Sequence, residues 1–536
     1  MQITQKKEYT NKIKNDKIAV IMARFKQTDS TQGLFLTVNL REQLLPGTFE
    51  WTINYLIDKV DTGAFEKNYK NEKLGAAAYS PRILLKVILY CYSKGIITSR
   101  KIEKACRENI IAKALAEELE PDHDTIATFI TSNNESVKEL FTQVVLQCSQ
   151  LGLISGEMFA MDGCKLPSNA SKEWSGTIKD LTKKRDKLKE YIARMIKTHK
   201  ELDNNKEAKE RLNNFRQTMG EDKERREKNI ERLEKRLKKL NTFLETAKPR
   251  IGAMGKEVQS NITDNESGRI LGSHGYIQGY NGIAMADSAN QVIICADVIG
   301  SASESTKLPK MLGLLEDNMK KVTGKKKPLE NAIVEADTGY FSEENLSEAI
   351  KRNIEVLIPD NQFRKRDSHF DGTKGRKEKK RFSIEDFNYD KKTDCFTCPA
   401  GKTLAHSSRI TLRKNTGKQY RAKVADCRNC ILADKCINKR GSKRDPLRSL
   451  YIVDKKHEKN LSNKMREKID KPVNRELYSR RMQIIEPVFS HITYLKGMDR
   501  FMLRGERKVK VQWLLYCIVH NMWKCIVPLA ERSNNL

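Results

Sequence analysis

The stretch EMFAMDGCKLPSNASK, residues 157–172, decides the fold that we expect for this chain. Its first part is short and apolar and stops at Asp162-Gly163, which is typical of a strand that runs into a turn. AIVEAD, residues 332–337, has the same pattern and also ends in an aspartate. If these two strands are neighbours in one sheet, their carboxyl ends bring Asp162 and Asp337 together.

A third acid, Glu486, ends an apolar run in YSRRMQIIEPVFSHI, residues 478–492, and we expect it on a helix that packs across the sheet. Carboxylates beside buried apolar elements are costly unless they are paired, hydrogen-bonded or bound to a metal. Three of them can hold two Mg²⁺ ions for in-line phosphoryl transfer. Each acid taken singly is better explained as a turn or cap residue. The choice between that explanation and a metal-binding role therefore depends on the residues around each acid.

The bulk composition indicates a multidomain protein that attracts polyanions. The chain has 536 residues, which is more than one core usually supports. Its 101 basic and 70 acidic residues give a formal charge of +31, and nucleic acid is the leading partner for such a surplus. An anionic membrane surface is the alternative, but the basic residues are spread along the chain and form no single amphipathic anchor. The sequence has no phosphate-binding loop or dinucleotide fingerprint, so an ATP-driven motor or a nicotinamide enzyme has no support.

The distribution of apolar residues predicts no membrane segment. The N-terminal residues MQITQKKEYTNKIKNDK lack the apolar core of a signal peptide. Polar residues interrupt the most apolar stretch, 511–530, which we therefore expect to be a buried helix. Twelve cysteines without a secretory signal indicate a reducing compartment. We expect a soluble, intracellular protein.

Two regions read as helical. Residues 30–150 show helical periodicity, with Ser99 and Asp124 as expected N-caps. This region is either a helix-turn-helix-like DNA-binding unit or a helical domain that dimerises or supports the core. Residues 177–247 are highly charged with apolar residues at heptad spacing, which predicts an antiparallel helical hairpin or a coiled coil between subunits.

Strand-like runs resume after this helical region. Residues 279–286 and 290–300 suggest a β-hairpin, and helical stretches then alternate with the runs 332–337 and 354–360. Antiparallel strands followed by alternating helices and strands imply a mixed α/β (α+β) core around a mixed sheet.

Cysteines suggest a second, smaller module. Cys395-x-x-Cys398 and Cys427-x-x-Cys430 have the spacing of two knuckles that supply four thiolates to a tetrahedral Zn²⁺, with Cys436 as a possible alternative ligand. A redox CxxC is the runner-up, although one pair would suffice for it. The third interpretation is that these cysteines are buried thiols with no common function. Zinc would stabilise the module.

Basic segments at 363–381 and 496–510 are candidate contacts with a phosphate backbone. The alternative interpretation of residues 363–381 is a disordered linker. We expect Tyr494 and Phe501 to be core residues and not base-stacking platforms. The candidate DNA-binding residues of the second segment are Lys496, Arg500, Arg504 and Lys508.

The residues around the three acids resemble the motifs of the DDE transposases of bacterial insertion sequences. MDGCKLPSNASK is similar to the D-G-T-K-x-x-A-N-A-like string at the family's first Asp, and EADTGYFSEEN to A-D-x-G-Y-x-S-x-x-N at its second. YSRRMQIIEPVFSHI is similar to Y-x-x-R-x-x-x-x-E-P-x-F-G. NITDNESGRI, GYNGIAMAD and FMLRGERKVKVQWLLYCIVHNMWK also have counterparts in the family. The resemblance runs in family order from about residue 30 to 530.

The resemblance implies an RNase H-like catalytic core with Asp162, Asp337 and Glu486 as catalytic residues and ligands of two Mg²⁺ (or Mn²⁺) ions. It also implies that Tyr478 and Arg481 position the helix or contact the DNA backbone at the transposon end. Three positions depart from the family pattern. Cys164 replaces a Thr, Ser490 replaces a Gly, and Thr493 stands where the family has a DNA-contacting Lys, for which Lys496 or Arg500 is the substitute.

These observations predict seven segments. They are a helical DNA-binding or oligomerisation domain (1–150), a first core part (151–176), a charged helical hairpin (177–250), a second core part (251–362), a basic loop (363–386), a zinc module (387–453) and C-terminal core helices with the catalytic Glu (454–536).

The resemblance implies a prokaryotic, nucleoid-associated transposase. It would bind the terminal inverted repeats of double-stranded DNA and join the element to target DNA as a homodimer or higher oligomer. A catalytically inactive zinc-containing DNA-binding protein and a metal-dependent nuclease without strand transfer are the alternatives.

Overall fold

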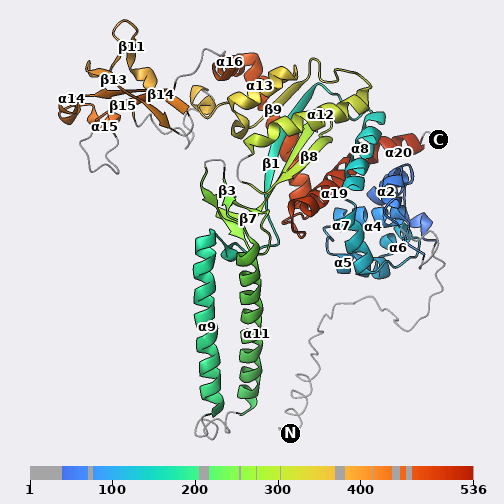
Figure 1. Ribbon diagram of the computed structural model, residues 1–536. Coiled ribbons are helices and arrows are strands. Elements are labelled where there is room, and N and C mark those ends of the chain that lie inside the picture. The colour runs from blue at the N-terminus through green and yellow to red at the C-terminus, as the bar shows by residue number, and fades with distance from the viewer. Residues whose placement is uncertain are drawn as a thin grey trace, which may run out of the picture. The chain divides into compact units, whose positions relative to one another are not determined.

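The computed structural model describes residues 39–69, 77–204, 216–252, 255–272, 275–301, 304–367, 381–412, 415–437, 447–453 and 461–534. The chain divides into two compact units, residues 1–39 and 40–536, and the description below concerns the second. This unit mixes helices and strands, as the sequence predicts, and Figure 1 shows its elements. Most of the basic loop expected at 363–386 lies outside the described residues.

A mixed sheet forms the centre of the unit. Its strands follow the order β10-β9-β1-β7-β6, and β8 also pairs with β7. β1 runs parallel to β9 and antiparallel to β7, so the two strands predicted to end in aspartates are neighbours. The strands are β1 (Met158–Pro167), β6 (Gly268–Gly272), β7 (Gly275–Asp287), β8 (Ile293–Ile299), β9 (Ile333–Ala336) and β10 (Glu355–Leu357).

The β7–β8 hairpin confirms the prediction made from residues 279–300. The two strands pair antiparallel, with Ala284 opposite Ala296. Gln291 has a φ of +60° in the connection, which lets the chain reverse between the two strands. Every residue of β8 is buried, so this hairpin lies in the core.

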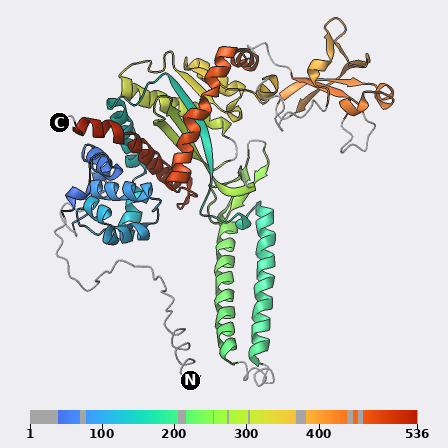
Figure 2. The ribbon, with the colours of Figure 1, turned by 180° about the vertical axis from the view of Figure 1, so that it is seen from behind.

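Helices cover the sheet. α12 and α19 contact β8, α13 contacts β10, and α18 lies against β1, as can be followed from behind in Figure 2. α19 contributes the fully buried Trp513, whose indole Nε1–H donates to the Ile283 carbonyl at 3.0 Å. A Cβ on Gly282 would stand 2.8 Å from that ring, so only glycine permits this close packing. The helices are α12 (Leu308–Thr323), α13 (Glu343–Lys351), α16 (Leu461–Ile469), α17 (Pro472–Ser479), α18 (Arg481–Ser490), α19 (Glu506–Lys524) and α20 (Ile526–Asn534).

The N-terminal helices share this core. α19 packs on α4 and α8, and α4 is buried along nearly its whole length. The expected N-caps are each wrong: Thr98 precedes the first turn of α5, and Asp122 caps α7 through the amides of Asp124 and Thr125. The helices are α2 (Phe49–Asp58), α3 (Gly63–Glu66), α4 (Pro81–Ser93), α5 (Ser99–Glu108), α6 (Ile110–Leu115), α7 (His123–Ser132) and α8 (Asn134–Gln150).

The charged segment forms two helices that contact each other, α9 (Ile178–Asn204) and α11 (Arg216–Thr246). They run antiparallel as a hairpin in Figure 1, one of the two arrangements that the heptad spacing predicts. Leu181 and Leu240 are fully buried where the helices meet short strands at their base. These strands are β2 (Ser175–Gly176), β3 (Arg250–Ile251), β4 (Glu257–Val258) and β5 (Ser260–Asn261).

A second sheet, with strand order β11-β12-β13-β14-β15, contains the cysteine-bearing segment. It has its own small core, centred on Phe396, Leu404 and Tyr420. The elements are β11 (Asn388–Asp390), β12 (Cys395–Thr397), β13 (Thr403–Leu412), β14 (Asn415–Ala422), β15 (Ser449–Val453), α14 (Val424–Arg428) and α15 (Ala433–Cys436).

Within the described ranges, no single helix is long and apolar enough to cross a membrane. Two consecutive helices, Glu506–Lys524 and Ile526–Arg532, are together long and apolar enough for a span, but they are bent by 41° at the break between them. The first of these helices is α19, which is buried among α4, α8 and β8.

Candidate active site

Two of the predicted acids lie at the carboxyl edge of the central sheet. The β1–β9 register ends at the pair Met161–Ala336, so Asp162, which lies within β1, is next to Asp337, which directly follows β9. Side chains alternate along a strand, so Glu335 shares the face of Asp337. The edge therefore gathers three carboxylates on one face of two adjacent strands.

Arg481 supplies the positive charge at this edge. It stands at the start of α18, is 8% exposed, and places Nη1 2.9 Å from Oδ2 of Asp162. Its guanidinium lies 5.7 Å from the centre of the Tyr478 ring. Burial disfavours its charge, but Tyr478, Asp162 and Asp337 more than offset this, so the pKa of Arg481 is raised. Arg481 is thus a permanently charged partner of the acids.

Glu486 lies on the exposed side of α18. Ile484, Ile485 and Val488 occupy the buried side of this helix. Within the described part of the chain, no hydrogen bond or ion pair joins Glu486 to Asp162 or Asp337. The structure therefore brings two of the three predicted acids together and places the third on the helix that carries Arg481.

Two further acids at this edge were missed by the sequence analysis. Glu304 forms an ion pair with Lys165, at 3.7 Å between Oε1 and Nζ, and burial together with the charge of Asp162 raises its pKa. Glu335 is fully buried, and burial raises its pKa to about 8 in spite of the nearby Arg481 and Arg480. Glu335 could have been found as an acid inside an otherwise apolar strand. Glu304 offers no such signal.

A cavity of about 1080 Å³ opens beside Asp337. Phe363, Tyr478 and Arg481 are among its lining residues. It is large enough for a nucleotide-sized group, with aromatic and cationic side chains next to an acid of the edge.

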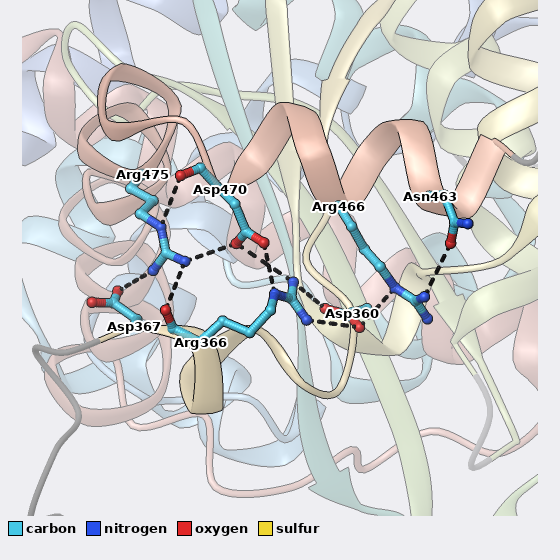
Figure 3. A network of polar contacts seen from close by, with 7 residues as sticks. All are labelled: Asp360, Arg366, Asp367, Asn463, Arg466, Asp470 and Arg475. Atoms are coloured by element: carbon cyan, nitrogen blue, oxygen red, sulfur yellow. Dashed lines mark hydrogen bonds and ion pairs between the residues drawn. The ribbon is translucent and has the colours of Figure 1, made fainter. Parts of the chain in front are cut away.

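One side of this cavity is built from a closed network of arginines and acids (Figure 3). Asp360 accepts from Arg366 and Arg466, at 2.7 and 3.0 Å. Burial of Asp360 opposes its charge, but the two arginines outweigh this, so its pKa is lowered. The members of this closed network are Asp360, Arg366, Asp367, Asn463, Arg466, Asp470 and Arg475. It holds the turn Phe363–Arg366 against α16 and α17.

Two family models match the chain. One, described as a transposase domain (DUF772), matches residues 38–132, and the other, described as a transposase DDE domain, matches residues 397–526, which include Tyr478, Arg481 and Glu486. The two matches support a DDE transposase of an insertion sequence. A search of curated proteins found no match. The matched models identify a DNA transposase in general terms, while Asp162 and Asp337 lie outside both matched ranges.

The basic residues at 496–510 differ in their surroundings in this transposase. Lys496 is 5% exposed, with Nζ 3.3 Å from the centre of the Trp523 ring, and burial lowers its pKa to about 8. In this position Lys496 packs against Trp523 of α19 and is too buried to contact DNA. Arg500, Arg504 and Lys508 are exposed.

The aromatic residues of this segment also differ. Phe501 is fully buried, as expected, but the expectation for Tyr494 is wrong, because it is 84% exposed. Tyr494 lies in a π-helical turn, His491–Leu495, that follows α18 and changes the helical phase.

The cysteines of the transposase separate into two groups. Cys398, Cys427, Cys430 and Cys436 line one cavity of about 20 Å³. Cys395 is outside this lining, and its thiol donates to the Thr393 carbonyl. As the described side chains stand, no group of three or more His, Cys, Asp or Glu residues is arranged to hold a metal ion.

Proposed function

We propose that this transposase catalyses Mg²⁺-dependent cleavage at the terminal inverted repeats of an insertion sequence and joins the freed 3′ ends to target DNA. The observation that carries the proposal is that Asp162, within β1, and Asp337, directly after the neighbouring parallel strand β9, follow the last residue pair of the two strands, with Arg481 on Asp162. The match of the DDE model to the segment with Tyr478, Arg481 and Glu486 supports it.

The proposal includes an RNase H-like core. Three strands in antiparallel succession, β1, β7 and β8, are followed by β9 and β10, which run parallel to β1. This arrangement supports the fold that the sequence motifs imply, with Asp162 within β1 and Asp337 directly after β9.

Asp162 and Asp337 would hold the divalent cations, because hard carboxylate oxygens are the donors that Mg²⁺ prefers. Bound cations would activate the attacking oxygen and stabilise the leaving oxygen of the phosphodiester. Glu486 would complete the ligand set from α18 after a change of its side-chain direction. Arg481 and Tyr478 would orient the DNA strand that enters the cavity beside Asp337.

The test uses the full-length protein, Mg²⁺ and a DNA duplex that carries the element's terminal repeats. We expect nicks at the repeat ends and joined products with target DNA. Asp162→Asn and Asp337→Asn should abolish both, while Asp317→Asn, an exposed acid on α12, should retain both. DNA binding without cleavage in the wild type would favour the inactive DNA-binding protein. Cleavage without joining would favour the nuclease.

The proposal extends to assembly. Two element ends have to be held together for joining, so we expect a homodimer or higher oligomer on paired end DNA. The helical hairpin α9–α11 and the N-terminal helices are the candidate contacts. Light scattering of the protein with end DNA tests this, and one protein per DNA end at every concentration would contradict it.

We also propose that a structural Zn²⁺ is held by Cys398, Cys427, Cys430 and Cys436. The supporting observation is that these four thiols line one cavity of about 20 Å³, with Cys436 in place of Cys395, the ligand that the CxxC spacing predicted. Zinc binding would require the four thiolates to come into tetrahedral contact. Cys436→Ser should lower the zinc content of the purified protein, and its matched control, Cys395→Ser, should not. The opposite result would return Cys395 to the ligand set.

A further inference from the structure

An arginine interrupts the apolar seam of the hairpin α9–α11. Leu233 and Leu240 of α11 are 9% and 0% exposed and lie seven residues apart, which is the spacing of a coiled-coil seam. Arg226 stands seven residues before Leu233, so it occupies the next position of the same seam. Its Nε is buried and has no hydrogen-bond partner among the described residues. A buried cationic group without an acid beside it is unfavourable, so its place in the seam calls for a reason.

Arg226 lines a cavity of about 610 Å³. The described residues around this cavity are basic apart from one amide: Arg225, Arg226, Lys228, Asn229 and Arg232. Arg225, Asn229 and Arg232 are four and three residues apart, so they lie on one face of α11. The cavity therefore has a positive wall, with no acid among the described residues that line it.

The acids between residues 224 and 231 are paired with other basic residues. The pairs are Glu224–Lys228, Glu227–His199 and Glu231–Lys235. In the part of the hairpin that the structure describes, Arg225, Arg226 and Arg232 form no ion pair. Arg232 donates from Nη2 to Asn229 Oδ1 at 2.7 Å, which orients its guanidinium and leaves its other N–H groups available. These three arginines therefore lack an anionic partner, although acids are close by in the sequence.

We infer that Arg225, Arg226 and Arg232, the arginine face, bind the phosphate backbone of duplex DNA. The inference rests on the proposed function, because the ligand is the DNA on which the transposase acts. Guanidinium groups donate paired hydrogen bonds to phosphate oxygens, and such contacts hold the duplex without reading its sequence. A phosphate in the cavity gives Arg226 the anionic partner that the described residues do not supply.

A second copy of the chain fits the arginine face less well than DNA does. The apolar side chains of the seam, Ile192 and Leu233 among them, are already buried in the hairpin. The lining of the cavity offers a partner only cations and one amide. DNA supplies the dense negative charge that complements such a surface.

The arginine face is separate from the strands that carry the catalytic acids. It lies about 20–30 Å along α11 from the end of this helix at Thr246, at the usual rise of an α-helix. Asp162 and Asp337 belong to the central sheet. We therefore expect the arginine face to contribute to DNA affinity and not to the chemical step.

The test measures the affinity of the full-length protein for labelled duplex DNA by fluorescence anisotropy, without divalent cations and at several salt concentrations. One duplex carries the terminal repeats, and the other has the same length and an unrelated sequence. The double variant Arg225→Gln/Arg232→Gln should bind both duplexes at least about tenfold more weakly, and the salt slope should fall by about 2, because two phosphate contacts are lost. Its rate of end cleavage in Mg²⁺ at saturating DNA should change less than about twofold.

The matched control is Arg185→Gln/Lys320→Gln, which removes two charges that already have acid partners. It should change DNA affinity less than about twofold. Equal losses of affinity in the control and in Arg225→Gln/Arg232→Gln would overturn the inference, because a general loss of charge would then explain both. Unchanged affinity and salt slope in Arg225→Gln/Arg232→Gln would also overturn it.

Arg226→Leu separates DNA binding from folding. Leucine continues the apolar seam, so the midpoint of thermal unfolding should stay the same or rise, while DNA affinity should fall at least about threefold. A lower midpoint with unchanged DNA affinity would contradict the role of Arg226 in DNA binding.

Two further outcomes distinguish this inference from the proposals on which it rests. A changed oligomeric state of Arg225→Gln/Arg232→Gln in light scattering, with unchanged DNA affinity, would make the arginine face a subunit contact and overturn the inference. If the wild type does not cleave end DNA, the proposed function is wrong. If it does cleave and the arginine substitutions have no effect on binding, only this inference is wrong.

Discussion

Two clusters of acids and arginines lie around the same cavity, and they differ in how completely they are paired. The closed network around Asp360 and Asp470 has every acid in contact with at least one arginine (Figure 3). The edge cluster of Asp162, Asp337 and Glu335 has Arg481, which is hydrogen-bonded to Asp162 alone among them. A fully paired cluster stabilises the fold, while an incompletely paired one keeps acids available for a cation. We therefore expect the closed network to stabilise the fold and the edge cluster to take part in catalysis.

The largest expected effect tests the edge cluster. Asp162→Asn should lower the rate of end cleavage about 1000-fold or more, because it removes a ligand of the activating cation. The free energy of unfolding should fall by less than about 2 kcal/mol, because Asp162 is partly exposed, the new amide oxygen can still accept from Arg481, and Asp337 keeps a negative charge nearby. Single-turnover cleavage and urea unfolding of the same preparation measure both. A large loss of stability would show that Asp162 stabilises the fold, as the acids of the closed network do.

The next effect tests the closed network. Asp360 is 3% exposed, but its arginine partners are partly exposed, so Asp360→Asn should lower the free energy of unfolding by about 2 kcal/mol. Cleavage at a temperature where the variant is folded should fall less than about tenfold. Asp317→Asn is the matched control for both measurements. If Asp360→Asn abolished cleavage without lowering the free energy of unfolding, the closed network would contribute to catalysis and not to stability, and the distinction between the two clusters would be wrong.

The smallest effect is the pH dependence of the same variant. The arginines lower the pKa of Asp360 from its ordinary 3.8, so its stabilising contribution is present above that pH and is lost as the pH falls below it. The difference in unfolding free energy between wild type and Asp360→Asn should be the same at pH 7 and pH 5 and should shrink at pH 3. A difference that stays constant down to pH 3 would mean that the charge of Asp360 contributes nothing.

Much of the edge could be predicted from the sequence because its signals are local. An apolar run that stops at an aspartate predicted β9 and the first half of β1, and alternation of helices and strands predicted the mixed sheet. Heptad spacing predicted the hairpin of α9 and α11 for the same reason. Each of these depends on residues close together in the chain. The turn expected at Asp162-Gly163 is wrong, because β1 continues to Pro167 by pairing with β7, a strand from a distant part of the chain.

What escaped prediction depends on contacts between distant residues. Glu335 is recognisable only once Ala160 is known to lie opposite it and Arg481 nearby. Lys496 was a plausible DNA contact until Trp523, from another helix, was found beneath it. Tyr494 was misplaced because its aromatic side chain alone suggested burial, whereas it lies in an exposed position of the π-helical turn after α18. The caps failed because Thr98 and Asp122 precede equally suitable polar residues.

The most direct test of the central claim exchanges an oxygen ligand for sulfur. Asp337→Cys should lose end cleavage in Mg²⁺ and regain it at least about tenfold in Mn²⁺, because the softer ion accepts a thiolate. Asp317→Cys should cleave equally well in Mg²⁺ and Mn²⁺. Full activity of Asp337→Cys in Mg²⁺, or equal inactivity of the folded variant in both ions, would contradict a catalytic cation between Asp162 of β1 and Asp337 after β9.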